Sequence, residues 1–227
     1  LFSLFIITWK FPESLQRNRE ATFNILASIH NVRKTFGWPK LQALFLATFS
    51  FAFGWSFFNE FIPLLLRKQL DFSLSDVGNY YAYGGAWYAL ASGVITPWFL
   101  QRFSPEKITP KALLGSAFCM LSFLFIQDKA NIWFILPPLM FCLSFTYPTT
   151  AAMVSNKTDP HHQGEVLGIY QSVIGCAMGL SPLLAGSLVG LYPSLTALGG
   201  SATMLASAYA LKWSKMAKRV NQTSSVL

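Results

Sequence analysis

The sequence has few charged residues for its length. Asp, Glu, Lys and Arg together make up 11% of its 227 residues, whereas a soluble domain typically carries about 25%. Hydrophobic residues make up 53% of the chain, and Phe alone occurs 21 times. This composition argues against an ordinary soluble domain and predicts an integral membrane protein.

Cysteine and histidine are also scarce, with three of each. The cysteines lie in three different apolar segments without metal-ligand spacing or a disulfide pattern, so we interpret them as packing residues. The histidines are His30, His161 and His162, and all three fall in predicted loops. The segment DPHHQGE at 159–165 has the composition of a metal site, but its Pro and Glu are typical of a turn leading into a helix. We therefore expect no bound metal.

Several catalytic motifs are missing as well. The sequence contains no HExxH and no GxSxG, so the common zinc and serine hydrolase patterns are absent. It also contains no GxxxxGK[ST] loop, which an ATP-driven pump uses to hold phosphate groups. We expect neither an enzyme nor a cofactor.

What the sequence does contain is a series of long apolar blocks. A helix needs about 20 apolar residues to cross a bilayer. The third block is short, and the sixth is rich in Ala, Gly and Ser, as is common where membrane helices pack closely. The sequence therefore predicts six transmembrane helices, at Leu41–Leu66, Val77–Leu100, Lys111–Ile126, Ile132–Val154, Val166–Leu191 and Ser194–Trp213.

The basic residues are distributed unevenly between the two sides of these blocks. Of the 17 Lys and Arg residues, only Arg67, Lys68 and Lys129 fall on one side, and the rest fall on the other. Cytoplasmic loops carry an excess of Lys and Arg, so we place the C-terminus and the segment before the first block in the cytoplasm. The net charge of +8 then indicates anionic lipid headgroups as partners and not nucleic acid.

The chain divides into four parts by composition. Residues 1–11 are apolar over half a span, and we interpret them as the end of a preceding transmembrane helix. Residues 12–39 form a cytoplasmic linker, which is either a surface amphipathic helix or a loosely ordered segment. The six-helix region covers 40–213, and a cytoplasmic tail covers 214–227. The expected fold class is all-α and integral to the membrane.

Glu60 is the one acidic residue inside a predicted span. An ionisable side chain in hydrocarbon costs several kcal/mol, so it marks a functional position by default. We predict that Glu60 is a proton-coupling site. The alternative is a hydrated position near the outer interface, since Arg67 follows only seven residues later.

Polar and aromatic residues around Glu60 are candidates for a substrate cavity. Ser56 lies one helical turn before Glu60, and Trp55 and Asn59 form the adjacent i, i+4 pair. Pro63 removes a backbone donor from the same helix, where it is either a hinge or a static kink.

The second predicted span begins with a cluster of aromatic residues. Tyr80 and Tyr81 are typical of anchors at a membrane interface. Tyr83 and Trp87 are deeper and four residues apart, so we predict that they line a cavity. Gly84 permits close contact between helices.

The fourth predicted span contains the segment FTYPTT at 145–150. Tyr147 and the three threonines are polar groups at membrane depth. They either satisfy backbone carbonyls near Pro148 or face a substrate path, and the sequence leaves both readings open.

Several segments together resemble motifs of the major facilitator superfamily. The best match resembles the tenth loop and eleventh helix of the tetracycline-resistance-like, drug:proton antiporter branch. One segment resembles the second cytoplasmic G-x-x-x-D-R-x-G motif but lacks its acidic residue. The segments are FPESL at 11–15, LSDVG at 74–78, GVITPWFLQRF at 93–103, QGEVLG at 163–168 with Gln171, and GLSPLLAG at 179–186.

The resemblance implies a specific architecture. The chain would be the C-terminal half of a 12-helix fold, with an N-terminal six-helix half as its partner and a substrate site near the midplane. It implies proton-coupled transport of a small molecule, with drug or metabolite efflux, in the bacterial inner membrane. A scaffold with a transporter-derived fold and no transport is the alternative.

The resemblance also adds residues to the candidate site. It places Gln171 in the cavity. It assigns packing and gating roles to Arg102, Gly164, Gly168, Gly179, Pro182 and Gly186, and Pro63 joins this group from its position in the first span.

Overall fold

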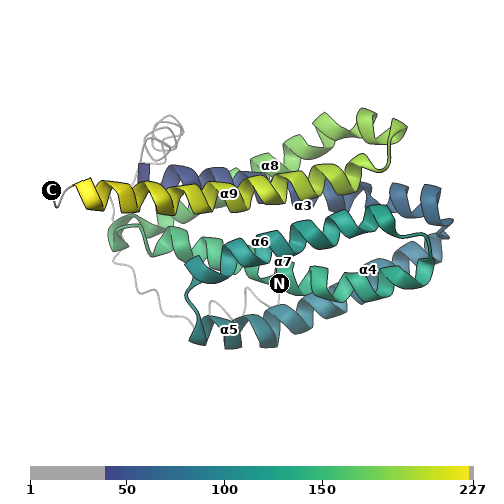
Figure 1. Cartoon of the computed structure of the whole chain (residues 1–227), viewed down its shortest axis with the longest axis horizontal. Helices are drawn as coiled ribbons and strands as arrows, with labels where there is room; N and C mark the ends of the chain where they lie inside the picture. The colour runs from purple at the N-terminus through teal and green to yellow at the C-terminus, as the bar shows by residue number, and fades with distance from the viewer. Residues whose placement is uncertain (1–38, 225–227) are drawn as a thin grey trace, which may run out of the picture. The chain divides into compact units, whose positions relative to one another are not determined.

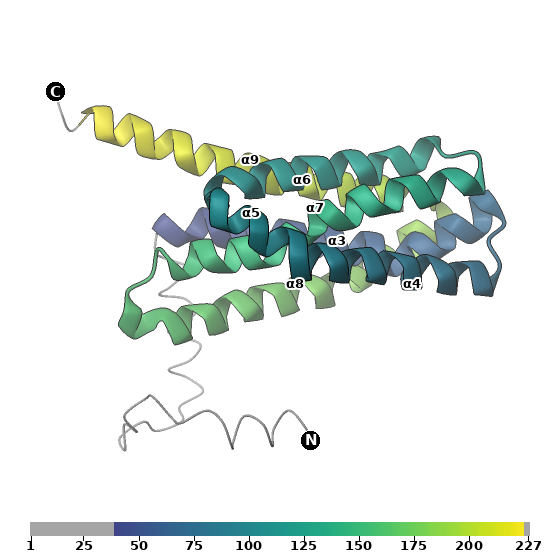
Figure 2. The same cartoon turned by 90° about the horizontal axis from the view of Figure 1, so that it is seen from below.

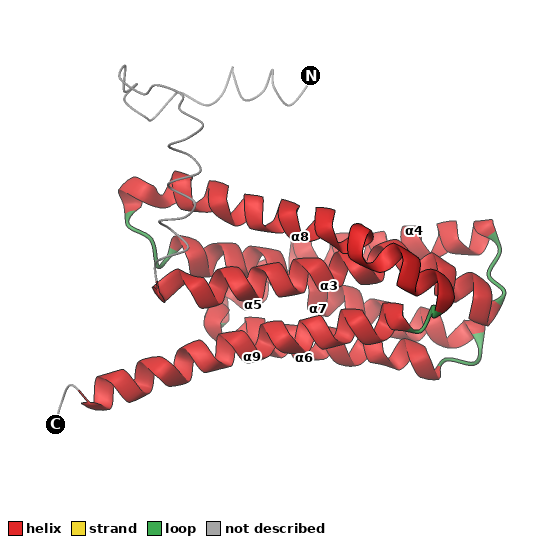
Figure 3. Ribbon diagram, turned by 90° about the horizontal axis from the view of Figure 1, so that it is seen from above, coloured by secondary structure: helices red, strands yellow, loops and turns green. Residues whose placement is uncertain are grey.

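The computed structural model describes residues 39–224, and it is helical throughout apart from short connections (Figure 1). The predicted helix end at residues 1–11 lies outside the described residues, as do almost all of the linker and residues 225–227. Helix labels begin at α3, as in Figure 1. The long helices run side by side and alternate in direction, joined by short loops (Figure 3).

The helices follow the apolar blocks of the sequence. The first block forms α3 (Pro39–Leu70). The second forms α4 (Leu74–Leu90), a π-helical turn at Ala91–Ile95, and α5 (Thr96–Arg102), which continue into one another. The remaining elements are α6 (Pro105–Ser122) with a 3₁₀ turn at Phe123–Phe125, α7 (Lys129–Ser155), a 3₁₀ turn at Pro160–His162, α8 (Gln163–Leu191) and α9 (Leu195–Ser224).

Four of these helices are long and apolar enough to cross a membrane. The qualifying segments are Leu41–Leu70, Pro105–Phe125, Lys129–Ser155 and Pro160–Leu184. The prediction of six spanning helices is therefore supported for four, and the count of six stays a prediction. The helix α4 has only 17 residues, although the continuous helical segment of α4, the π-helical turn and α5 extends to Arg102.

Two helix boundaries lie more than five residues from the predicted ones. The helix α6 begins at Pro105 and not at Lys111, because Pro at the first helical position suits a helix start even where the residues are polar. The helix α9 continues past Trp213 to Ser224. Five consecutive residues of this extension, Lys215 to Arg219, are Lys, Met, Ala, Lys and Arg, and these residue types have high helix propensity.

The helix α3 lies at the centre of the packing. It contacts α9, α8 and α7, while α6 packs between α7 and α9, and α4 packs against α7 (Figure 2). Large apolar side chains of α3 such as Phe51, Phe58 and Ile62 are fully buried. One edge-to-face pair joins α3 to the end of α6, with the rings of Phe58 and Phe123 5.2 Å apart.

Candidate functional site

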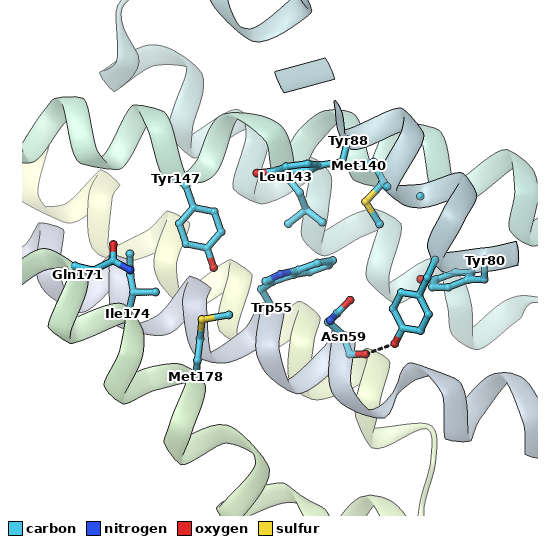
Figure 4. A pocket seen from close by; sticks show the side chains of 13 residues that line it. Trp55, Asn59, Tyr80, Tyr88, Met140, Leu143, Tyr147, Gln171, Ile174 and Met178 are labelled. Carbon is cyan, nitrogen blue, oxygen red and sulfur yellow. Dashed lines mark hydrogen bonds between the residues drawn. The ribbon is translucent and has the colours of Figure 1, made fainter. Parts of the chain in front are cut away.

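A cavity of about 460 Å³ lies between α3, α4, α7 and α8 (Figure 4). The residues that α3, α7 and α8 contribute come from the middle of each helix. Ligand pockets of proteins commonly have volumes of about 300–1,000 Å³. The cavity therefore has the size of a small-molecule site, at mid-depth of the helices.

The α3 wall consists of Trp55 and Asn59. The two residues are four apart, so they project from the same face of the helix. The Trp55 ring stacks on Phe58 at 6.4 Å between ring centroids. The neighbouring Phe51 ring meets Tyr147 of α7 edge-on at 5.0 Å, which fixes α3 and α7 relative to each other at the cavity.

The α4 wall consists of Tyr80, Tyr81, Gly84, Gly85 and Tyr88. The spacing of four places these residues on one stripe of the helix. The Tyr81 hydroxyl donates to the backbone carbonyl of Asn59 at 2.7 Å, which is the dashed line in Figure 4. The interpretation of Tyr80 as an interface anchor is wrong, because its side chain is only 2% exposed and lines the cavity.

A capping box just outside the predicted span fixes where α4 begins. The Ser73 hydroxyl accepts from the Asp76 amide at 3.1 Å, while the Asp76 carboxylate accepts from the Ser73 amide at 2.9 Å and from its hydroxyl at 2.8 Å. The Ser73 amide, and then its hydroxyl, lower the pKa of Asp76 below its ordinary value. The ionised carboxylate suits a helix N-terminus, and the fixed start sets the rotation of α4 that brings its tyrosines to the cavity.

The α7 wall consists of Met140, Leu143 and Tyr147. The spacing of three and four residues again defines one face of the helix. The sequence left two readings open for the polar residues of this segment, and the structure separates them. Tyr147 lines the cavity, whereas Thr146, Thr149 and Thr150 are fully buried.

The hydroxyl groups of Thr149 and Thr150 bond within α7, and Thr150 also reaches α8. Thr149 donates to the Phe145 carbonyl at 2.6 Å, and Thr150 donates to the Thr146 carbonyl at 2.7 Å. Thr150 also lies 2.8 Å from the Tyr170 hydroxyl of α8. These bonds support α7 and its contact with α8 behind the cavity wall.

The α8 wall consists of Gln171, Ile174 and Met178. Ser56, a predicted cavity residue, lies behind this wall and does not line the cavity. It is 4% exposed, and its hydroxyl donates to the Met178 carbonyl at 3.3 Å. The role of Ser56 in this structure is to join α3 to α8.

Tyr83 and Trp87 are also outside the cavity lining. Their rings lie 6.2 Å apart, and the Tyr83 ring meets Trp133 of α7 at 5.4 Å. They form an aromatic contact between α4 and α7. Of the seven predicted cavity residues, the structure thus places Trp55, Asn59, Tyr147 and Gln171 in one lining.

Glu60 is exposed on α3, directly after the cavity residue Asn59, and is not itself part of the lining. Among the side chains that the structure describes, no basic one forms an ion pair with it. The other acidic residues of the described helices lie in first turns, namely Asp76, Glu106 and Glu165. Glu60 is therefore the acidic side chain that these helices place in a helix interior.

The predicted packing and gating residues occupy varied positions. Pro63 is half-buried in an uninterrupted α3. The Arg102 guanidinium lies 4.2 Å from the centre of the Trp98 ring, a cation–π geometry. On α8, Pro182 is exposed, Gly186 has only an ordinary contact with Phe61, and the described residues leave open space beside Gly164, Gly168 and Gly179.

Close helix contact uses other glycines. A Cβ atom at Gly199 of α9 would lie 2.6 Å from the Phe57 ring, and one at Gly200 would lie 3.0 Å from the Phe58 Cβ atom. Gly54 of α3 faces Thr203 in the same interface. The contacts at Gly199 and Gly200 agree with the close packing expected of the small residues in the sixth predicted span, whereas the sequence did not single out Gly54.

The described residues contain no group of three or more His, Cys, Asp or Glu side chains that would hold a metal ion. In the DPHHQGE segment, the His162 ring lies 3.5 Å from the Glu165 carboxylate. Asp159 caps the turn by accepting from the His161 amide at 2.9 Å. The segment thus has the geometry of a capped turn before α8.

Comparison with known proteins agrees with the helical architecture. The model of the Major Facilitator Superfamily matches the chain over residues 2–182 and again over residues 44–225. None of the curated proteins matches the chain. Each of the two family matches covers well over half of the sequence. The chain therefore belongs to the Major Facilitator Superfamily, a family of membrane transporters and not of enzymes.

Proposed function

We propose that this protein is a secondary transporter that moves a small molecule across the membrane by alternating access, coupled to protons. The observation that carries the proposal is the cavity of about 460 Å³ between α3, α4, α7 and α8. The chain belongs to a transporter family, and the cavity lies at mid-depth of its helices. Transporters of this architecture bind substrate at that depth. The motifs on α8 favour efflux of a drug or metabolite, in the manner of the tetracycline-resistance-like branch.

Glu60 is the proposed proton site. It follows the cavity residue Asn59 directly and lies in a helix interior. An ionisable side chain in the interior of a membrane helix marks a functional position by default. Protonation of Glu60 next to the cavity would then link proton movement to the substrate.

Lipid headgroups and a second six-helix half are the proposed partners of the described helices. The basic ends of the helices would face anionic headgroups on the cytoplasmic side of a bacterial inner membrane. An N-terminal six-helix half would complete the wall of the cavity, and the exposed glycine face of α8 would be available to it.

The test is solute transport in proteoliposomes under an imposed proton gradient, with Glu60→Gln compared to the wild-type protein. We expect gradient-driven transport in the wild type and loss of coupling, with binding retained, in Glu60→Gln. The control is Glu106→Gln, which removes an acidic group from the first turn of α6 and should leave coupling intact.

Two outcomes would contradict parts of the proposal. Equal gradient-driven transport by Glu60→Gln and by the wild type would rule out Glu60 as the proton site. Absence of transport for every compound that the folded protein binds would favour the non-transporting scaffold.

A further inference from the structure

The cavity wall carries no formal charge. None of its thirteen lining residues is Asp, Glu, Lys, Arg or His. The nearest acidic residue along α3 is Glu60, which is exposed and outside the lining. A charged ligand in this cavity would lose its hydration without gaining an opposite charge from this wall, and that loss is costly.

The wall does carry hydrogen-bonding groups that are available to a ligand. Within the part of the chain that the structure describes, no hydrogen bond engages the Trp55 indole N–H, the Asn59 and Gln171 side-chain amides or the Tyr147 hydroxyl. Together these groups offer donors and acceptors but no charge. A ligand with polar groups of its own is needed to satisfy them.

The remaining surface of the cavity consists of aromatic rings and flexible methionine side chains. Figure 4 shows the side chains of Trp55, Tyr147 and Met178 extending from α3, α7 and α8 into the space between these helices. Aromatic rings favour stacked or edge-to-face contact with other rings. Methionine side chains adapt to the outline of a bound molecule. The chemistry of the wall matches a flat ring system.

We propose that the cavity selects an uncharged, ring-containing molecule with hydrogen-bonding groups, held between Trp55 and Tyr147 and oriented by Asn59 and Gln171. This inference rests on the proposed function in taking the cavity as the substrate site. It goes further by assigning the substrate class from the wall, with anions and ions of localised positive charge disfavoured.

The test is equilibrium binding to the full chain in nanodiscs, without any gradient, using four matched probes. Naphthaleneacetamide is uncharged, naphthylethylamine is cationic, naphthaleneacetate is anionic, and the decahydro analogue of the amide has no aromatic ring. We expect the amide to bind about tenfold more tightly than each of the other three, a difference in the range of one good aromatic or polar contact.

Substitutions of lining residues test whether the amide binds in this cavity. Trp55→Leu should weaken binding of the amide about tenfold, and the matched control Trp213→Leu should not, because Trp213 is 64% exposed on α9 and is not a lining residue. Gln171→Leu changes an exposed side chain and so keeps the fold. It should weaken binding about fivefold, as expected for one hydrogen bond.

Equal or tighter binding of a charged probe, or no binding of the amide to folded protein, would overturn the inference. Binding unaffected by both Trp55→Leu and Gln171→Leu would overturn the site. Transport is scored separately with the same amide in proteoliposomes. Selective binding without transport would leave the ligand class standing and remove the transporter. Gradient-driven transport of charged compounds alone would leave the transporter standing and remove the proposed ligand class.

Discussion

At the scale of single residues, buried hydroxyl groups connect the helices. Ser207 of α9 donates to the Ala47 carbonyl of α3 at 2.8 Å, and Thr109 of α6 donates to Thr149 of α7 at 2.7 Å. Thr96 and Ser144 lie 2.9 Å apart across the α5–α7 contact. Water does not compete for such bonds in the apolar interior, so each adds a small, position-specific contribution to packing.

We predict that Ser207→Ala lowers the free energy of unfolding by about 0.6 kcal/mol, the average for a hydrogen bond between membrane helices. The bond is buried and joins α9 to α3, so water cannot replace the hydrogen bond that the substitution removes. Ser201→Ala is the matched control, because the Ser201 hydroxyl donates within its own helix, to Leu198. Detergent-induced unfolding measures both variants, and an equal effect of the two substitutions would contradict the prediction.

The cavity residues differ in how well the sequence identified them. Trp55, Asn59 and Tyr147 were predicted because a polar or aromatic group stands out in an apolar span, and Gln171 was predicted from the family resemblance. Met140, Ile174 and Met178 were missed although they line the same cavity. An apolar side chain has the same pattern whether it faces lipid, a neighbouring helix or a cavity, so only the packed structure distinguishes them.

At the scale of helices, α3 and α9 approach each other through glycine. A methyl group at Gly54 would overlap the Thr203 side chain and lie 3.1 Å from the Gly200 carbonyl oxygen. Thr203 cannot move aside easily, since its branched side chain is restricted and its hydroxyl donates to the Gly199 carbonyl at 2.9 Å. The small residues therefore set the distance between the two helices.

We predict that Gly54→Ala destabilises the protein by about 1–3 kcal/mol, as overpacking of a tight interface typically does. Gly78→Ala is the control, because nothing lies within 4 Å of a Cβ atom at Gly78 in α4. That substitution should be neutral or slightly stabilising, since Ala favours a helix over Gly. Thermal unfolding of both variants in detergent is the measurement, and a Gly54→Ala variant as stable as Gly78→Ala would show that the interface can expand freely.

Helix positions were more predictable than helix contacts. Each apolar block of 40–213 contains a helix, because hydropathy and chain length strongly restrict a membrane segment. The start of α6 was misplaced because residues 105–110 are polar yet helical. The spacing of glycines on α8 suggested close packing, but the tightest glycine contacts among the described helices occur at Gly54, Gly115, Gly199 and Gly200. A glycine pattern does not reveal which neighbour it faces.

At the scale of the whole molecule, the cavity is lined by helices that alternate in direction along the chain. The connections at one end include Lys68, which donates to the Gly190 carbonyl at 2.9 Å, and Lys129, which donates to the Asp71 carbonyl at 2.7 Å. These bonds join neighbouring helix ends on the side that we predict to be outside the cell. Alternating access requires that the cavity open toward each side of the membrane in turn. This exposure to both sides is the central property of the proposed transporter.

The most direct test is cysteine accessibility of the cavity from both sides of the membrane. Met178→Cys is introduced on α8 after Cys119, Cys142 and Cys176 are replaced by Ser, and membrane-impermeant thiol reagents are applied to right-side-out and inside-out vesicles. The lining position of Met178 makes this variant a reporter of the cavity itself. Gln127→Cys and Asp159→Cys, in loops at opposite ends of α7, report the sidedness of the vesicles.

We predict that Met178→Cys reacts from both sides, and that Gln127→Cys reacts only from outside and Asp159→Cys only from inside. Reaction of Met178→Cys from both sides with such controls would support alternating access independently of any known substrate. Reaction from one side only, with and without a proton gradient, would contradict it.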